Sequence, residues 1–244
     1  MVIGLDQRRL YDDLAWLWPI ISPPADYDEE AEDCAARIRQ FSRIPVSTLL
    51  HLGSGGGHLD HRLQQHFTVT GVDCSPNMLN LARTLNPAVR YLLGDMRNVR
   101  LGESFDAALI ADSIDYMLDE SELLQAFATV FAHLHPGGVF LTYAEMTSEL
   151  FQQNRTTHSV HRQGSLEVVM VENSYDPDPN DTRFDSTFVY LVRRDGGLEI
   201  MHDRHQVGLF PRQTWGKLLR VAGFDLVREE LCQEILYLAG VRPI

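Results

Sequence analysis

The chain has 244 residues, 44% of them hydrophobic, and its mean hydropathy is −0.17. These values favour one soluble α/β core with an embedded subdomain over two large domains. A formal net charge of −13 and an isoelectric point of about 5.1 disfavour nucleic acid and anionic membranes as partners, because an acidic surface repels phosphate.

The three cysteines, Cys34, Cys74 and Cys232, are odd in number and far apart, which argues against a disulfide framework or a zinc site. Residues 1–10 lack the apolar centre of a signal peptide, and no stretch approaches the length of a membrane span. We therefore expect a cytoplasmic protein that needs no metal.

Two helices separated by a proline-rich stretch are expected at the amino end. Residues 5–18 have apolar side chains at helical spacing. Residues 28–43 begin with acids and end with arginines, as the helix dipole prefers. Tyr11 and Tyr27 flank the proline-rich stretch. Two interpretations of residues 1–45 stay open: a helical lid over a ligand, or a helical hairpin packed on the core.

Strands and helices alternate over residues 46–144, which predicts a mostly parallel sheet. Ser75 is a natural N-cap, and Pro76 suits the first position of a helix. The expected strands are residues 48–52, 69–72, 91–93, 107–111 and 139–143, and the expected helices are residues 58–66, 76–86 and 120–134.

The pattern becomes β-rich after residue 145, with clear turn signals between the segments. We predict an antiparallel insertion of about three strands over residues 145–210, which serves as a substrate cover or a dimer surface. Residues 211–244 would add a helix and the two final strands of the main sheet. The expected strands of the insertion lie near residues 166–172, 184–193 and 198–209.

Four glycines stand within five positions directly after the first expected strand, from Gly53 to Gly57. Glycine allows positive φ and places no Cβ between the backbone and a ligand. Asp73 ends the next strand, at a spacing that suits a carboxylate bound to a ribose diol. Dinucleotide oxidoreductases favour the pattern G-x-G-x-x-G. The glycines here fall instead as Gly53-x-Gly55-x-Gly57.

This glycine pattern resembles the loop of Rossmann-like S-adenosylmethionine-dependent methyltransferases, and Gly94-Asp95-Met96 resembles the next motif of that class. The resemblance implies a three-layer α/β sandwich with a seven-stranded, mostly parallel sheet whose last strand is antiparallel. It also implies that residues 46–144 bind S-adenosylmethionine, with S-adenosylhomocysteine as the product. His51 stands where the class usually has an acid that helps to hold the methionine amino group.

The resemblance extends through most of the chain to a subgroup of small-molecule N-methyltransferases that dimethylate nucleotide-linked amino sugars. It is carried by Tyr11-Asp12 and Asp26-Tyr27 at the amino end and by the segment from Glu199 to His205 in the insertion. This subgroup implies a single methyltransferase domain over residues 1–244 and a small-molecule acceptor, methylated at nitrogen.

The same resemblance places individual residues around the cofactor. The glycine loop would hold the methionine end, Asp73 the ribose, and Asp95 with Met96 the adenine. Ala111 and Asp112 would lie beside the sulfonium. The full expected cofactor-binding set is Tyr11, Tyr27, His51, Gly53, Ser54, Gly55, Gly57, Asp73, Cys74, Met78, Asp95, Met96, Ala111 and Asp112.

Four residues are the candidates for catalysis: Tyr11, Tyr116, His202 and His205. Tyr11 matches the lid tyrosine of the subgroup, and the subgroup's candidate base, a histidine, falls at Tyr116. A neutral amine is nucleophilic without a strong base, and histidine titrates in the useful range if a base is needed. Packing or substrate contact for Tyr116, and ordinary strand roles for the two histidines, stay open as alternatives.

Two other functions and one assembly state remain to be weighed. A nicotinamide-dependent oxidoreductase would use similar elements, although the glycine pattern and Gly94-Asp95 speak against it. A catalytically silent cofactor-binding protein is favoured by His51 in place of the usual acid. A strand-rich insertion often pairs with its mate, so a homodimer belongs among the expected partners.

Overall fold

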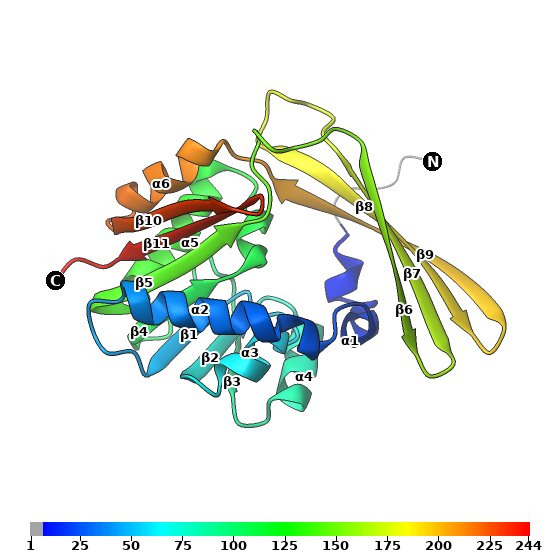
Figure 1. Cartoon of the computed structure of the whole chain (residues 1–244), viewed down its shortest axis with the longest axis horizontal. Helices are drawn as coiled ribbons and strands as arrows, with labels where there is room; N and C mark the ends of the chain where they lie inside the picture. The colour runs from blue at the N-terminus through cyan, green and yellow to red at the C-terminus, as the bar shows by residue number, and fades with distance from the viewer. Residues whose placement is uncertain (1–6) are drawn as a thin grey trace.

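The computed structural model describes residues 7–244 and contains two β-sheets (Figure 1). The larger sheet has seven strands in the order β10-β11-β5-β4-β1-β2-β3. Only β11 runs in the direction opposite to the other six strands, so the predicted main sheet is confirmed. Its strands are β1 (Thr48–Leu52), β2 (Thr68–Asp73), β3 (Arg90–Leu93), β4 (Phe105–Ile110), β5 (Leu134–Ala144), β10 (Asp225–Cys232) and β11 (Ile235–Val241).

Helices cover both faces of this sheet and complete a three-layer sandwich (Figure 1). Along β1, Leu49 packs in the apolar cluster beneath α2, whereas Leu50 and Leu52 pack in the cluster beneath α5 and α6. Burial on both faces explains the nearly continuous apolar sequence of the strand. The helices are α2 (Asp28–Phe41), α3 (His58–Leu63) and α4 (Pro76–Leu85) on one face, and α5 (Glu120–His133) and α6 (Arg212–Val221) on the other.

The insertion after β5 forms a separate antiparallel sheet of four strands in sequential order. The sequence predicted about three of them and missed β6. Most side chains of β6 are polar and exposed, because it is an edge strand, so its sequence carries no apolar alternation. The strands are β6 (Arg155–Gln163), β7 (Leu166–Tyr175), β8 (Arg183–Arg194) and β9 (Gly197–Gly208).

The amino-terminal segment differs from the continuous helix expected over residues 5–18, of which residues 5 and 6 lie outside the described part. It consists of short turns of helix, and the single-helix prediction is wrong. Arg8 has φ of +43°, which is not a helical value. The backbone N–H of Leu10, which would donate within a continuous helix, donates instead to Asp203 Oδ2 on β9 at 2.7 Å. The turns are η1 (Arg9–Tyr11), η2 (Ala15–Leu17), α1 (Trp18–Ile21) and η3 (Pro24–Tyr27).

This segment joins the two sheets. Leu10, Leu14 and Leu17 are buried in one cluster with Tyr190 and Met201 of the small sheet. The carboxyl ends of the parallel strands therefore face a wall made of the amino-terminal turns and the inner face of β6–β9. Within residues 7–244, no helix is both long and apolar enough to cross a bilayer.

Candidate active site

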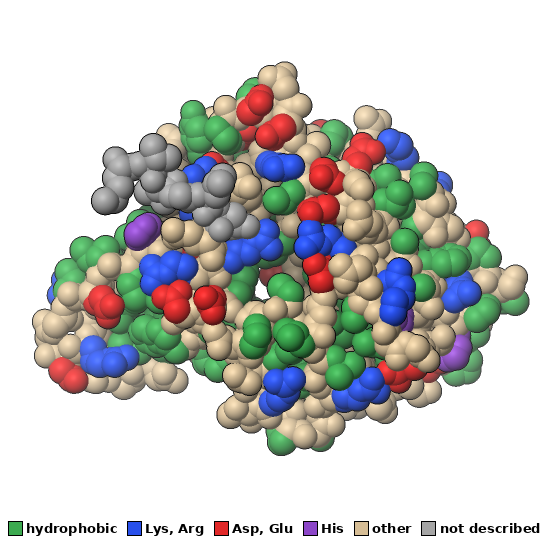
Figure 2. All heavy atoms as spheres, turned by 180° about the vertical axis from the view of Figure 1, so that it is seen from behind, with side chains coloured by type: hydrophobic (Ala, Val, Ile, Leu, Met, Phe, Trp, Pro, Cys, Tyr) green, Lys and Arg blue, Asp and Glu red, His purple; other side chains and the backbone are tan. Residues whose placement is uncertain are grey.

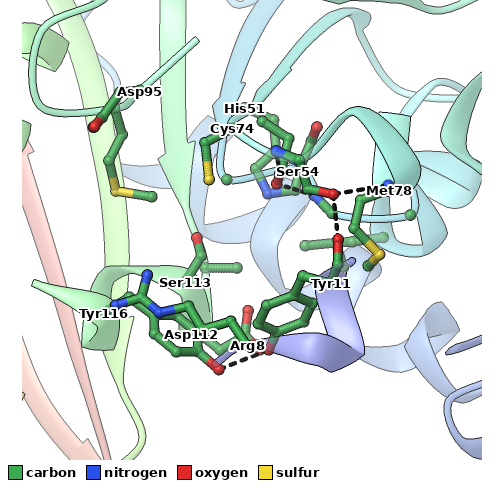
Figure 3. A pocket seen from close by; sticks show the side chains of 18 of the residues that line it. Arg8, Tyr11, His51, Ser54, Cys74, Met78, Asp95, Asp112, Ser113 and Tyr116 are labelled. Atoms are coloured by element: carbon green, nitrogen blue, oxygen red, sulfur yellow. Dashed lines mark hydrogen bonds between the residues drawn. The ribbon is translucent and has the colours of Figure 1, made fainter. Parts of the chain in front are cut away.

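A cavity of about 440 Å³ lies at the carboxyl ends of β1, β2 and β4 (Figure 3). It is lined by every residue of the expected cofactor-binding set except Gly57. On the reverse face of the molecule, acidic and basic side chains gather around a hollow (Figure 2). We call the cavity of about 440 Å³ the first cavity. The sequence prediction missed several of its lining residues, among them Arg8, Trp18, Glu30, Arg97 and Ser113.

The glycine loop is shaped by close packing. Gly53 has φ of +71°, and a Cβ at this position would lie 2.1 Å from Ser113 Oγ. The N–H groups of Gly53 and Ser54 both donate to the carbonyl of Val72, at 2.7 and 3.0 Å. Positive φ and the lack of space both require glycine here. The loop therefore brings backbone, without a side chain, to the wall of the cavity.

Gly57 is the one member of the expected cofactor-binding set that does not line the cavity. It has φ of +74° and precedes α3, and its carbonyl accepts a hydrogen bond from Asn86 Nδ2 at 2.7 Å. A Cβ on Gly57 would lie 2.6 Å from the Tyr91 hydroxyl. This glycine therefore allows the start of α3 to pack against Asn86 and Tyr91.

Asp73 is held at the cavity wall by two backbone groups. Its Oδ2 accepts from Gly55 N–H and its Oδ1 from Ser75 N–H, both at 2.8 Å. Burial raises the pKa of the Asp73 carboxyl, against the opposing effect of these hydrogen bonds. The two N–H groups fix the orientation of the carboxylate and leave it further lone pairs for a ligand.

Asp95 has a partner that the sequence prediction did not name. Arg97 binds its carboxylate through Nη2 at 2.6 Å and Nε at 3.0 Å and also pairs with Glu122. The hydrogen bonds from Arg97 hold the pKa of the Asp95 carboxyl below its usual range. The end of the cavity expected to hold the adenine therefore presents an ion pair, in which some lone pairs of the Asp95 carboxylate are already occupied.

His51 forms a buried pair with Asp60 behind the cavity wall. His51 Nδ1 lies 2.7 Å from Asp60 Oδ1, and the Tyr91 hydroxyl donates to Asp60 Oδ2 at 3.0 Å. Burial opposes protonation, but the charge and hydrogen bond of Asp60 outweigh it and raise the pKa of His51. His51 Nε2 is buried and has no partner among the described residues.

A second cavity of about 570 Å³ lies between the main sheet and the inner face of the small sheet. The two cavities share a wall that contains Tyr11, Trp18, Tyr27, Asp112 and Tyr116. A ligand in the first cavity and a ligand in the second would therefore meet at these side chains.

The second cavity is acidic. Asp112, Asp115, Glu145 and Glu172 line it, and Arg155 is the single arginine or lysine among its described lining residues. Burial, followed by the charges of Asp112 and Glu30, raises the pKa of Glu145 to about 8. Asp115 Oδ1 is buried without a partner among the described residues. Such a lining favours a cationic or hydrogen-bond-donating ligand.

Three of the four catalytic candidates are connected in series. The hydroxyls of Tyr11 and Tyr116 lie 2.8 Å apart (Figure 3), and Tyr116 Oη lies 2.7 Å from His205 Nδ1. His205 Nε2 in turn lies 2.8 Å from Asp203 Oδ2. Burial opposes ionisation of Asp203, but its hydrogen bonds with His205 and the backbone hold the pKa of its carboxyl below the usual range.

Comparison with known proteins identifies the family of the chain. Residues 49–138 match a methyltransferase domain family. A dTDP-3-amino-3,4,6-trideoxy-alpha-D-glucopyranose N,N-dimethyltransferase of Streptomyces venezuelae is 32% identical over 203 residues, which cover 81% of this chain and 83% of that protein. The chain belongs to the S-adenosylmethionine-dependent methyltransferases.

Solved structures agree with this methyltransferase assignment. Streptomyces venezuelae DesVI is 27% identical, with a TM-score of 0.84, and the match covers 98% of this chain and 99% of that one. CalS10, an amino pentose methyltransferase of Micromonospora echinaspora solved with S-adenosylmethionine bound, is also 27% identical, with a TM-score of 0.79 and coverage of 88% and 91%. The likeness to DesVI therefore extends over nearly the whole chain, well beyond the residues that match the methyltransferase domain family.

The first cavity of the methyltransferase fits its cofactor on two observations. His51 Nε2 and Ser54 Oγ are buried, unpartnered polar atoms among the described residues, at the place expected for the methionine end. Beside them, Gly53 brings backbone without a side chain to the cavity wall, because a Cβ there would overlap Ser113 Oγ. Polar groups buried without partners are costly, so a polar ligand at this position is favoured.

His202 is the catalytic candidate that the methyltransferase does not bring to either cavity. It is exposed, whereas Asp203 and His205 are buried. Neighbouring side chains of a strand point to opposite faces, so residues 203 and 205 share the face that 202 cannot share. This alternation could have predicted from the sequence that Asp203 lies on the same face as His205. Asp60, nine positions from His51, had no such signal.

Proposed function

We propose that this methyltransferase binds S-adenosylmethionine in the first cavity and methylates the amino nitrogen of an amino sugar held in the second. The observation that carries the proposal is the shared wall of the two cavities at Tyr11, Asp112 and Tyr116. Methyl transfer is an in-line displacement, so donor and acceptor must meet at one point in fixed orientation. The shared wall offers such a point.

Individual residues have proposed roles toward the cofactor. Bound S-adenosylmethionine supplies an activated methyl group on its sulfonium. Asp73 would accept hydrogen bonds from the ribose, and the Asp95–Arg97 pair would border the adenine. His51 Nε2 and Ser54 Oγ would bind the methionine end. Cys74, Met78 and Met96 line the same cavity and would enclose the ligand, as would Tyr27 and Ala111.

The lining of the second cavity supports an amine acceptor. Asp115, Glu145 and Glu172 offer hydrogen-bond acceptors, and an amino group or its ammonium form supplies donors. The relative from Streptomyces venezuelae, which is named as acting on a dTDP-linked amino sugar, points to the same class. The acidic charge of the chain supports a small molecule in preference to nucleic acid.

Methyl transfer to matched acceptors tests this proposal. Purified protein is incubated with methyl-labelled S-adenosylmethionine and a dTDP-linked 3-amino-3,6-dideoxyhexose, and the product is followed by mass spectrometry. The matched control is the same nucleotide sugar with a hydroxyl in place of the amine. We expect methylation of the amine alone. Tight cofactor binding without turnover on a panel of amino sugars would favour a silent binding protein, and binding of NAD in place of S-adenosylmethionine would favour an oxidoreductase.

We also propose that the outer face of the small sheet joins two copies of the chain. Val160, Val169, Leu191 and Ile200 form one apolar row across all four strands, through their pairing in register. Val160 and Ile200 are 57% and 64% exposed. A continuous apolar patch on a sheet face is costly in water, and a second copy offers the same patch across a two-fold axis.

Light scattering tests the assembly. We expect a dimer mass for the wild type and a monomer mass for Ile200→Glu. Val221→Glu is the matched control, because Val221 is 60% exposed on α6, away from the sheet face. A monomeric wild type at high micromolar concentration would refute the proposed dimer.

The remaining proposed roles are that residues 1–45 act as a lid and that residues 145–210 cover the acceptor.

A further inference from the structure

The hydrogen-bonded series Tyr11–Tyr116–His205–Asp203 begins in the shared wall of the two cavities and ends in the protein interior. We propose that this series is a proton relay, which takes a proton from the ammonium form of the acceptor at Tyr11 and stores it on His205. The inference rests on the proposed function, since it requires an amine acceptor. It extends that function by naming the path of the proton.

The direction of each hydrogen bond follows from the chemistry of its partners. Asp203 is fully buried and accepts Leu10 N–H at 2.7 Å, and as a carboxylate it accepts only. His205 Nε2 must then carry a proton and donate to it. In the neutral imidazole Nδ1 is bare, so Tyr116 donates to Nδ1 and Tyr11 donates to Tyr116. The relay is therefore aligned in one direction.

This alignment leaves the Tyr11 oxygen with lone pairs only. Its single proton is used toward Tyr116, and its free lone pairs lie where the two cavities meet. Tyr11 Oη can consequently accept a hydrogen bond from an N–H group of the acceptor, and it cannot donate one. An acceptor that presents an ammonium matches this requirement better than one that presents a carbonyl.

The transfer balances without any further reactant. One N–H bond of the ammonium breaks as the nitrogen proton passes to Tyr11 Oη. The Tyr11 proton passes to Tyr116 Oη, and the Tyr116 proton passes to His205 Nδ1. Both tyrosines end as neutral phenols, and His205 ends as an imidazolium beside the Asp203 carboxylate. The amine now holds the lone pair that an in-line attack on a sulfonium requires.

Burial keeps the stored proton away from water. His205 is 1% exposed, and the Phe188 ring lies against it with ring centroids 4.9 Å apart. Burial raises the pKa of Tyr11 well above its usual range, so a lasting tyrosinate is disfavoured and the proton shifts are concerted. Charged groups face the relay from every element packed against it. Around the two tyrosines they are Asp112 and Asp115 on η4 (Asp112–Tyr116), Glu145 after β5, Glu172 on β7, Arg155 on β6, and Arg8 over the Tyr116 ring. Near Asp203 they are Arg9 and Asp13 of the amino-terminal segment.

Nitrogen NMR of the histidines tests the relay without turnover. In the protein bound to S-adenosylhomocysteine, we expect the neutral imidazole of His205 to carry its proton on Nε2. Addition of the dTDP-linked amino sugar should convert it to the imidazolium in the wild type and leave it neutral in Tyr116→Phe. A neutral His205 with its proton on Nδ1 would reverse the alignment and overturn the relay, whatever the acceptor is.

The pH dependence of kcat/KM supplies the second test. Below the pKa of the acceptor amine, we expect kcat/KM of Tyr116→Phe and of His205→Gln to be on the order of 10²-fold lower than that of the wild type. Above that pKa they should recover to within about threefold, because free amine then binds directly. His202→Gln, on the outer face of the same strand, is the matched control for folding and should follow the wild type at every pH.

An equal loss at every pH would show that the hydrogen bonds only position Tyr11, and no loss at any pH would show that the relay is idle. Either result overturns the proposal. A wild type that methylates no amine would instead refute the proposed function, and the tautomer of His205 would still report on the relay. Calorimetric binding of S-adenosylhomocysteine verifies that each variant retains its fold.

Discussion

His51 Nδ1 lies 2.7 Å from Asp60 Oδ1, and both side chains are at most 2% exposed. The methyltransferase class usually has an acid at the position of His51. Here the acid is Asp60, which lies behind His51 as seen from the cavity. The wall of the first cavity therefore has an imidazole in place of a carboxylate. This exchange changes both the stability of the fold and the binding of the cofactor.

The His51–Asp60 pair predicts a pH dependence of stability. Asp60 raises the pKa of His51 above its ordinary value of about 6.5, against the effect of burial. The stabilisation is thus fully present below that ordinary value and is lost as the pH rises through the folded pKa. Asp60→Asn should remove this dependence and cost about 3 kcal/mol at pH 6, because the buried His51 loses the carboxylate that pairs with it. Urea unfolding at several pH values measures both effects, and an unchanged pH profile in Asp60→Asn would contradict the assignment.

Cofactor affinity should depend on His51 in particular. Its free Nε2 is expected to bind the methionine end, and hydrogen bonds to charged groups contribute about 1.5–3 kcal/mol. His51→Asn should therefore weaken calorimetric binding of S-adenosylmethionine by about ten-fold or more. His133→Asn is the matched control, since His133 is 2% exposed and bonds Thr129 and Leu101 outside both cavities. Equal losses in both variants would assign the effect to stability alone.

Gly53 and Gly102 separate backbone strain from lack of space. Both have φ of +71°, but a Cβ on Gly53 would meet Ser113 Oγ at 2.1 Å, whereas a Cβ on Gly102 would meet nothing within 4 Å. Gly102→Ala should lower the free energy of unfolding by about 1 kcal/mol. Gly53→Ala should lower it by several kcal/mol and should also weaken cofactor binding. Thermal unfolding and calorimetry measure the two. Similar costs for both variants would mean that the loop relaxes around the new methyl group.

The centre of the main sheet was predictable from the sequence because strands such as β1 and β4 are buried on both faces. Leu49 and Leu50 pack on opposite faces of β1. Because both faces are buried, consecutive residues of the strand are apolar, and the sequence shows a continuous apolar run. β6 is an exposed edge strand, so nothing in its composition required it to be apolar, and it was missed. Local signals thus recover the elements that carry the core.

The site was recovered in the same uneven way. Asp73 and the glycine loop lie at fixed spacings after strands, and they line the expected cavity. Asp60 is recognisable only through its tertiary contact with His51. Strand alternation would have paired Asp203 with His205 and excluded His202, but no local pattern shows that β9 faces Tyr116. Contacts between distant elements are set by packing, which one sequence does not display.

Glu145 should hold the acceptor amine at a cost to the stability of the empty protein. Burial, then the charges of Asp112 and Glu30, raises its pKa to about 8. An acid with a raised folded pKa destabilises the protein as the pH rises from its unfolded value, about 4.3, through the folded one. Glu145→Gln should therefore unfold at a higher temperature than the wild type at pH 9 and at a similar temperature at pH 4.

At pH 9, where Glu145 is mostly ionised, the same variant should bind the amine less well, because it removes a negative charge from the wall of the acceptor cavity. We expect KM for the amino sugar to rise about ten-fold or more, while S-adenosylmethionine affinity stays within about threefold. Glu199→Gln removes the same charge from an exposed position on β9 and should change neither quantity. A gain in stability at pH 9 without a change in KM would keep Glu145 as a strained buried acid but remove it from acceptor binding. A loss of stability at pH 9 would contradict the raised pKa itself.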